Sequence, residues 1–224
     1  MIPPVTVYKN IVPESVRTDL CTWFEEPDDL VDSRPDCVSK SPKWNSGNWP
    51  QHLLEPVIKN LHTEAYEVEM TLFFNNIHSR FMVHVDSGLG KAHQSIYQTM
   101  IIPLAVAGDV GTVFFKNYWT DRCSKFTKKP SQESYTYQSN GDLKNQTVSD
   151  YRDIQGYSGR PFNQDVYNRY LQHIDYDDLE GLEFDCYVPW VPGDVIVFPR
   201  EQLHAASSGV LPKLGVSVFT NRIQ

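Results

Sequence analysis

Two stretches near the N-terminus repeat apolar residues at helical spacing. Between residues 13 and 26 the apolar positions 16, 20, 23 and 24 form one stripe of a helix. After a loop rich in Asp, Pro and Ser, a second stripe follows, formed by Leu53, Leu54, Val57, Ile58 and Leu61. We therefore expect two amphipathic helices that support the rest of the fold from residues 1–65.

From about residue 66 the pattern becomes that of β-strands. Residues 66–74 alternate and then become apolar on both faces, and residues 80–86 form a short run that closes at a Ser-Gly-Leu-Gly turn. Further candidate strands are residues 97–104, 111–115, 184–190, 195–198 and 214–220. Many short strands with Gly/Pro turns and few helices indicate an antiparallel sandwich or barrel.

A long polar segment, residues 117–183, separates the strands of residues 66–116 from those of residues 184–222. It is rich in Tyr, Ser, Asn, Gln and Asp, and it is too long for a plain connection in a compact sheet. We expect an insertion with one short helix near Gln164–His173, which lines or covers the mouth of a binding site. Residues 1–224 then form a single domain.

Composition and charge narrow the class of protein. The formal net charge of −8 repels a polyphosphate backbone, which weighs against nucleic acid as a partner. No apolar run approaches the length of a membrane span, and the N-terminus lacks a secretory signal, so we expect a cytoplasmic protein with no membrane partner. The four cysteines, at positions 21, 37, 123 and 186, lack the close pairing of a thiolate zinc site and are expected to be reduced and partly buried. The oligomeric state is left open.

The chemistry centres on His84-Val85-Asp86 in the strand of residues 80–86. Residues i and i+2 of a strand project to the same face, so the imidazole and the carboxylate can reach one ion. Two histidines and one carboxylate on one face of a metal form the facial triad of non-haem iron(II) oxygenases, which leaves coordination positions open. The remaining histidine is best placed at His204, which follows a turn and the strand of residues 195–198.

The His-x-Asp motif alone is weak, because the chain also contains His173-Ile-Asp175 and His62-Thr-Glu64. His62 ends a helical pattern, where residues i and i+2 diverge by about 200° and make a poor chelate. His173 follows a polar helix and precedes a loop-like stretch. Only His84 lies in a strand followed by several more strands, so we favour it.

Two segments of the chain resemble a known family. Pro192-Gly-Asp-Val-Ile-Val-Phe198 running into His204, followed by Lys213-Leu-Gly-Val-Ser-Val-Phe219, resembles the C-terminal half of the 2-oxoglutarate/iron(II) dioxygenase superfamily, in the branch of prolyl hydroxylases and phytanoyl-CoA-type oxygenases. The resemblance spans roughly residues 66–116 and 184–222. It implies a mainly β fold with flanking helices, built on a double-stranded β-helix, the jelly-roll core shared with cupins.

The resemblance also implies the cofactors. These are Fe(II) held by His84, Asp86 and His204, the cosubstrate 2-oxoglutarate, and O2, with oxidative decarboxylation coupled to hydroxylation of a small-molecule or peptide substrate. In that superfamily a basic residue, usually Arg, follows the distal histidine by nine or ten residues and pairs with the distal carboxylate of 2-oxoglutarate. The corresponding residue here is Lys213, which keeps the charge but lacks the bidentate fork of Arg.

A second departure from the superfamily lies two residues further on, where members often carry Ser or Thr and this chain has Gly215. A helper hydroxyl for the cosubstrate must then come from elsewhere, with Thr99 and Ser217 as candidates. Arg222 is the substitute for Lys213 if the lysine points outward.

Two other classes of function use the same residues. A cupin-like enzyme could hold zinc or manganese at His84, Asp86 and His204 for hydrolysis or isomerisation, and a non-catalytic jelly-roll module could bind a ligand through aromatic residues. The order of Pro-Gly-Asp turn, distal histidine and basic residue favours the oxygenase. The sequence does not indicate the prime substrate.

Overall fold

The computed structural model describes residues 4–26, 31–33, 37–47, 49–61, 64–76, 81–86, 96–119, 137–139, 142–144, 154–209 and 212–223. Its strands are β1 (Thr6–Tyr8), β2 (Val31–Ser33), β3 (Cys37–Lys40), β4 (Tyr66–Asn76), β5 (Ile96–Val106), β6 (Gly111–Tyr118), β7 (Tyr137–Ser139), β8 (Asp142–Lys144), β9 (Phe184–Pro189), β10 (Val195–Pro199), β11 (Gln202–Ala206) and β12 (Lys213–Arg222). The helices are α1 (Glu14–Glu25), α2 (Gln51–Lys59), α3 (Gln164–Val166), the π-helical turn η3 (Tyr167–Leu171) and the 3₁₀ turn η4 (Tyr176–Leu179).

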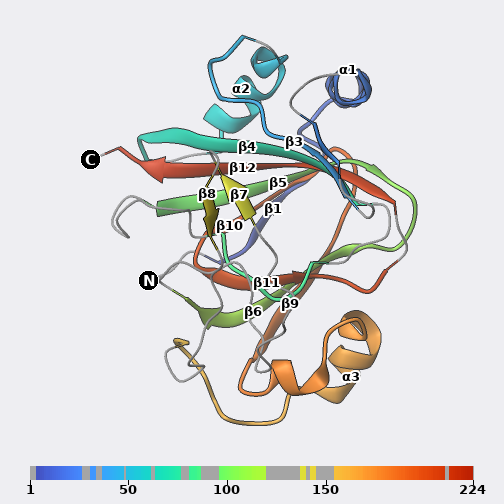
Figure 1. Ribbon diagram of the computed structural model, residues 1–224, viewed down its shortest axis with the longest axis vertical. Helices are drawn as coiled ribbons and strands as arrows, with labels where there is room; N and C mark the ends of the chain where they lie inside the picture. The colour runs from blue at the N-terminus through green and yellow to red at the C-terminus, as the bar shows by residue number, and fades with distance from the viewer. Residues whose placement is uncertain are drawn as a thin grey trace.

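Two antiparallel sheets lie face to face (Figure 1). Within the described part of the chain, the larger sheet has the order β1-β10-β5-β12-β4-β3-β2 and the smaller one the order β11-β6-β9. Helices α1 and α2 cover the outer side of the larger sheet, and α3 lies on the opposite side of the molecule, against the smaller sheet. This arrangement is a double-stranded β-helix with flanking helices and confirms the predicted fold class.

Alternation along the strands divides the apolar side chains among three layers. The outer face of the larger sheet, which includes Leu214, Val216 and Val218 of β12, packs against α1 and α2. Phe114, Phe198 and Trp190 belong to the layer between the two sheets. The alternate positions of β12, beginning with Lys213, therefore face this inner layer.

Residues 154–183 form the third layer on the outer face of the smaller sheet. Val83, Val113, Phe115, Leu203 and Ala205 project from that sheet and pack against apolar side chains of this segment. Those side chains are Ile154, Phe162, Leu171, Ile174, Leu179 and Leu182. The polar segment of the sequence thus contains the apolar residues that cover one side of the fold.

Most predicted elements are confirmed within one to three residues at each end, including α1, α2 and the strands β4, β5, β6, β9, β10 and β12. Four strands that pair in the two sheets, β1, β2, β3 and β11, were not predicted. The predicted helix near 164–173 is a short α-turn, capped by the Asn163 side chain, that continues as a π-turn. The predicted strand 80–86 is an irregular segment, described from residue 81, that joins the smaller sheet through a bridge between His84 and His204.

Cys21 and Cys186 are free thiols and are half buried, as predicted. The side chains of Cys37 and Cys123 lie outside the described residues. Among the helices that the structure describes, none combines the length and the apolar character needed to cross a membrane.

Candidate metal centre and cosubstrate site

The main chain of two strands sets the positions of His84 and His204. The His84 N–H donates to the His204 carbonyl at 2.9 Å, and the His204 N–H donates to the His84 carbonyl at 3.0 Å. Residues that exchange both bonds in an antiparallel pair lie directly opposite each other, with their side chains on the same face. The two imidazole rings accordingly lie with their centroids 4.1 Å apart. They point into the space between the sheets, because Val83, Val85, Leu203 and Ala205 point the other way.

Both rings have the same tautomer, which follows from their second nitrogen atoms. His84 Nδ1 lies 2.7 Å from the Met82 carbonyl, and His204 Nδ1 lies 2.9 Å from the Gln202 carbonyl. A carbonyl oxygen only accepts hydrogen bonds, so each Nδ1 carries the proton and donates it. Each Nε2 points at Asp86, and it is the ring nitrogen that remains available to a metal ion.

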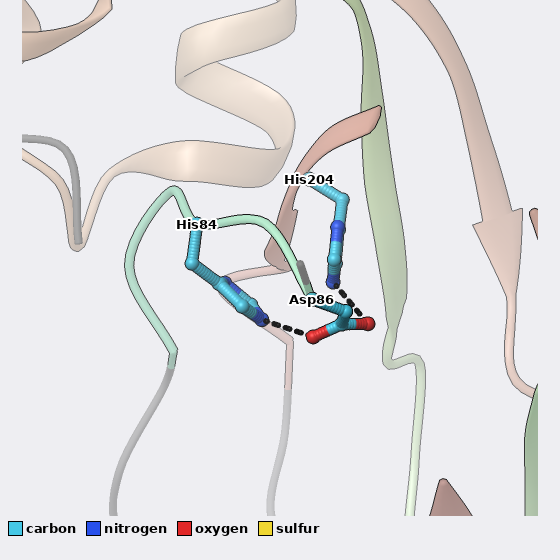
Figure 2. Close-up of side chains that lie close together, drawn as sticks. All are labelled: His84, Asp86 and His204. Carbon is cyan, nitrogen blue, oxygen red and sulfur yellow. Dashed lines mark ion pairs between the residues drawn. The ribbon is translucent and has the colours of Figure 1, made fainter. Parts of the chain in front are cut away.

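Asp86 completes the cluster, as Figure 2 shows. Its Oδ1 lies 3.8 Å from His84 Nε2, and its Oδ2 lies 3.5 Å from His204 Nε2. The three donor atoms all lie within 4.8 Å of one another. Ligands about 2.1 Å from one ion and at right angles to each other are about 3 Å apart, so small side-chain adjustments would bring these atoms to coordination distance. Thr99 Oγ1 donates to Asp86 Oδ2 at 2.9 Å and holds the carboxylate in this orientation.

The electrostatics of the cluster favour a cation. Burial, and then the charge of His204, lower the pKa of His84 to about 4, although the Asp86 carboxylate acts in the opposite direction. His84 is therefore neutral at pH 7. The Nε2 atoms of the two histidines and the Asp86 carboxylate, with side chains only 4–16% exposed, converge on one another. A largely buried carboxylate is favourable only with a positive charge or hydrogen-bond donors beside it, and a metal ion bound among these three side chains would supply that charge.

Aromatic rings surround the cluster on its inner side. The rings of Phe198 and Phe114 lie 4.7 and 5.8 Å from that of His204, centroid to centroid, and 4.9 Å from each other. The ring of Phe81 lies 5.2 Å from that of His84, and this residue is 47% exposed. Phe114 and Phe198 therefore cover His204 on its inner side, whereas His84 contacts a partly exposed ring.

Lys213, the predicted partner of the cosubstrate, is 3% exposed. Its ammonium lies 4.5 Å from the centroid of the Trp190 ring, in the layer between the sheets, and its charge contributes to lowering the pKa of His84. Arg222, the alternative, is exposed at the end of β12, where its Nε donates to Glu64 Oε2 at 3.0 Å. Of the two basic residues, Lys213 alone faces the interior that holds the histidines.

Trp190 also explains Gly215. A Cβ atom at position 215 would lie 2.8 and 2.9 Å from two ring atoms of Trp190, closer than real side-chain contacts. The indole is fixed in turn by a hydrogen bond from its Nε1 to Thr112 Oγ1 at 3.0 Å. The ring therefore occupies the space that a serine or threonine side chain would need, and Ser217 is the next inward-facing position of β12.

Solved structures share this architecture, although no protein-family model and no curated protein matches the sequence. The non-haem α-ketoglutarate-dependent carbocyclase SnoK from nogalamycin biosynthesis gives a TM-score of 0.54 at 13% identity, over 97% of this chain and 80% of that one. A 2OG-Fe(II) oxygenase family oxidoreductase from Burkholderia pseudomallei gives 0.52 at 10% identity, over 98% and 84%. HygX from Streptomyces hygroscopicus, solved with nickel and 2-oxoglutarate, gives 0.51 at 10% identity, over 97% and 82%.

The chain has the fold of the 2-oxoglutarate/iron(II) oxygenases. In this oxygenase fold, His204 lies on β11 of the smaller sheet, a main-chain bridge pairs His84 with it, and the Asp86 carboxylate contacts Thr99 of the larger sheet. The candidate site therefore lies between the two sheets.

The competing motif does not join this site. His173 Nδ1 pairs with Ser208 Oγ at 2.9 Å, and the Asp175 side chain accepts a hydrogen bond from the Asp177 N–H at the start of η4. Neither residue contributes to the cluster with His204. His62, of the third motif, lies outside the described residues.

The apolar side chains of residues 154–183 do not face the candidate site, and the expectation that residues 117–183 line or cover its mouth stays a prediction. Val83 and Val85 alternate with His84 and Asp86 along one segment, and the valines pack against residues 154–183. The apolar side chains of residues 154–183 thus cover the face of the smaller sheet opposite to His84, Asp86 and His204. Most of the preceding part, including residues 120–136 and 145–153, lies outside the described residues.

Two residues that complete the site were not predicted. Trp190 precedes the Pro-Gly-Asp turn, and the one sequence signal for it is the glycine at position 215, where a hydroxyl residue is usual. Arg200 follows the strand β10 and contacts both main-chain groups of Asp86. An arginine next to a turn is ordinarily a surface residue, so no pattern in the sequence distinguishes this one.

Proposed function

We propose that this protein is a non-haem iron(II) oxygenase that couples oxidative decarboxylation of 2-oxoglutarate to hydroxylation of a small-molecule or peptide substrate. The observation that carries the proposal is the convergence of two imidazole Nε2 atoms and one carboxylate between the sheets of an oxygenase fold. Two histidines and one carboxylate are the ligands of non-haem Fe(II) oxygenases, and they leave positions for further ligands.

In this proposal His84, Asp86 and His204 hold the iron, which supplies the activation of O2 when it is bound. The Met82 and Gln202 carbonyls keep both histidines in the metal-binding tautomer. Thr99, considered from the sequence as a partner of the cosubstrate, instead orients Asp86 through its hydroxyl. Phe114 and Phe198 exclude water from the inner side of the site.

Lys213 would neutralise the distal carboxylate of 2-oxoglutarate. Its burial and its place on the inward face of β12 support this role, as does the effect of its charge on the pKa of His84. The ammonium held over the Trp190 ring is partly desolvated, so an incoming carboxylate gains a stronger charge-assisted hydrogen bond than it would at the surface. Ser217 remains a candidate for an additional hydroxyl donor.

The substrate class is a wider proposal. HygX has also been solved with hygromycin B bound beside nickel and 2-oxoglutarate, at a TM-score of 0.52 and 10% identity. That complex supports a small molecule as one possible class for this chain. The exposed ring of Phe81, next to His84, is the described apolar surface that a substrate would meet first.

Succinate release from 2-oxoglutarate tests the proposal without knowledge of the substrate. The metal-free protein is incubated with Fe(II), 2-oxoglutarate and O2, and succinate is quantified against the same reaction with the Asp86→Ala variant. We expect the wild type to release succinate without a prime substrate and the Asp86→Ala variant to release none. A protein that binds Zn(II) or Mn(II) at this site, and yet neither binds nor consumes 2-oxoglutarate, would instead be a cupin-like hydrolase or isomerase.

A further inference from the structure

Arg200 has the largest side chain that is fully buried among the described residues, with 1% of its surface exposed. It lies in the turn between β10 and β11, two residues after Phe198 and four before His204. We infer that Arg200, anchored by Glu69, is a positioning residue that holds Asp86 in the geometry needed to bind a metal ion. The inference rests on the proposed function, because it concerns the same metal ligands.

Arg200 contacts Asp86 in two ways. Its Nε–H donates to the Asp86 carbonyl at 2.7 Å, and its own carbonyl accepts from the Asp86 N–H at 2.8 Å. Arg200 thus bonds both the main-chain N–H and the main-chain carbonyl of Asp86. Together with the Thr99 hydroxyl on the carboxylate, these bonds fix the peptide and the side chain of Asp86.

The guanidinium is itself held from the larger sheet. Nη1 donates to Glu69 Oε2 at 2.6 Å and to Asn221 Oδ1 at 3.0 Å, and it lies 3.3 Å from the Thr220 carbonyl. A buried cation without such partners would be strongly unfavourable. Charge-assisted bonds of this kind are shorter and stronger than neutral ones, so the position of Nε is well defined.

Two β-bulges interrupt the pairing of β12 near Phe219, beside the Arg200 guanidinium. The pairing of β12 with β4 passes from Phe219 and Met70 to Thr220 and Val68, which leaves Glu69 without an opposite residue. The pairing of β12 with β5 shifts between Phe219 and Asn221, which leaves Thr220 unpaired on that side. Bulges redirect side chains and carbonyl groups, and here both supply partners to the Arg200 guanidinium.

The consequence concerns how the two sheets meet. His84 and His204 are fixed within the smaller sheet, whereas Glu69, Thr220 and Asn221 belong to the larger one. Besides the bridge between His84 and His204, two described main-chain bonds join segment 81–86 to the turn and strand beside it. The Ala206 N–H donates to the Phe81 carbonyl, and the Asp86 N–H donates to the Arg200 carbonyl. Arg200 therefore connects the metal-binding end of this segment to the opposite sheet, and so sets the distance from Asp86 to the two histidines.

Metal affinity of the Arg200→Lys variant tests the inference. Lysine keeps the charge that pairs with Glu69 and the main-chain bond to Asp86, but it has no donor at the Nε position. The metal-free proteins are titrated with Co(II), and the dissociation constant and the visible absorption of bound Co(II) are measured well below the unfolding temperature. Changes in groups that orient metal ligands typically weaken affinity by about 10- to 100-fold, and we expect a loss in that range with an altered Co(II) spectrum.

Lys40→Met is the matched control, because Lys40 is also a buried cation, 2% exposed, with bonds to the Trp23 and Glu26 carbonyls on the far side of the larger sheet. It should lower the unfolding temperature without changing Co(II) affinity. If Arg200→Lys does not fold, Glu69→Gln replaces it, since this change leaves the arginine in place and loosens its anchor. A several-fold loss of affinity is then expected.

The outcomes separate the two proposals. If a folded Arg200→Lys protein binds Co(II) with the wild-type affinity and spectrum, the positioning role is overturned and the proposed function stays intact. The same result for Glu69→Gln, where that variant is used, has the same meaning. A wild-type protein whose Co(II) binding does not depend on His84 would contradict the proposed function itself.

Discussion

His84 and His204 lie opposite each other and exchange both of their main-chain hydrogen bonds, so the backbone fixes the spacing of the two histidines before any ion binds. Their Nδ1 atoms donate to carbonyl groups two residues earlier on their own strands. None of the bonds that place the strands uses the Nε2 atoms. The site is thus organised in advance for a ligand that both histidines share, which reduces the entropy lost on binding.

Replacing either histidine with alanine should abolish iron binding with little effect on the fold, because the main-chain bonds between the two strands remain. Iron content of His84→Ala and His204→Ala, measured after anaerobic reconstitution, checks this. His173→Ala is the control and should keep the wild-type content. Full occupancy in His84→Ala together with loss in His173→Ala would move the metal to the other motif.

Lys213→Ala should raise the 2-oxoglutarate requirement far more than it changes iron affinity. The variant removes the proposed partner of the distal carboxylate, and a charge-assisted pair in a buried site is worth a few kcal/mol, or roughly tenfold to several hundredfold in affinity. Anaerobic titration of the Fe(II) protein with 2-oxoglutarate measures the effect. Arg222 forms an exposed ion pair with Glu64, so Arg222→Ala should bind 2-oxoglutarate as the wild type does. Weaker binding by Arg222→Ala, with unchanged binding by Lys213→Ala, would make Arg222 the partner of the distal carboxylate.

Gly215→Ser should destabilise the protein by about 1–3 kcal/mol, the usual cost of adding atoms to a packed interior. The new Cβ would meet the Trp190 ring, which cannot move easily while its Nε1 is bonded to Thr112. In a Trp190→Leu background the same change should cost much less, so a double-mutant cycle of unfolding free energies isolates the contact. Equal costs in both backgrounds would mean that Trp190 is not the reason for the glycine.

Cys186 should react slowly with thiol reagents at neutral pH. Burial, and then the charge of Asp185, raise the pKa of this thiol to about 11, two units above the ordinary value of 9.0. The reactive thiolate is therefore roughly a hundredth as abundant at pH 7.5 as on an unperturbed thiol, and it increases as the pH rises toward 11. Peptide-level mass spectrometry of iodoacetamide labelling between pH 7 and 10 checks this. Labelling of Cys186 at the rate of a free thiol at pH 7.5 would contradict the burial described here.

The general fold and the His84-Asp86 pair of the candidate site could be predicted because both depend on local patterns. Alternating strands and the His84-Val-Asp86 spacing each need only a few adjacent residues. Other features depend on distant partners. Strand β11, Gln202–Ala206, contains no β-branched or aromatic residue and forms because β6 pairs with it. The contacts of Arg200 with Glu69 join positions 131 residues apart, and no local pattern encodes them.

The polar segment of residues 117–183 is a second case in which local patterns do not reveal contacts with distant residues. Its apolar residues are too widely spaced for a strong periodic signal, and its average composition suggested a surface loop. Leu171, Ile174 and Leu179 nevertheless come together on the outer face of the smaller sheet, where the alternate positions of segment 81–86 and β11 require cover. Composition averages over a segment, whereas burial depends on where each apolar residue lies.

Leu179→Ala should therefore destabilise the protein while leaving the metal site unchanged. Leu179 is fully buried in the layer formed by residues 154–183, and truncation of a buried leucine costs about 2–5 kcal/mol. The metal ligands lie on the other side of the smaller sheet, so Co(II) affinity of the folded variant should match the wild type. Replacing residues 118–180 with a short linker should expose the same face and prevent stable folding. A shortened protein that folded, bound iron and hydroxylated its substrate normally would show that the segment is dispensable, and Leu179→Ala would then be expected to have little effect on stability.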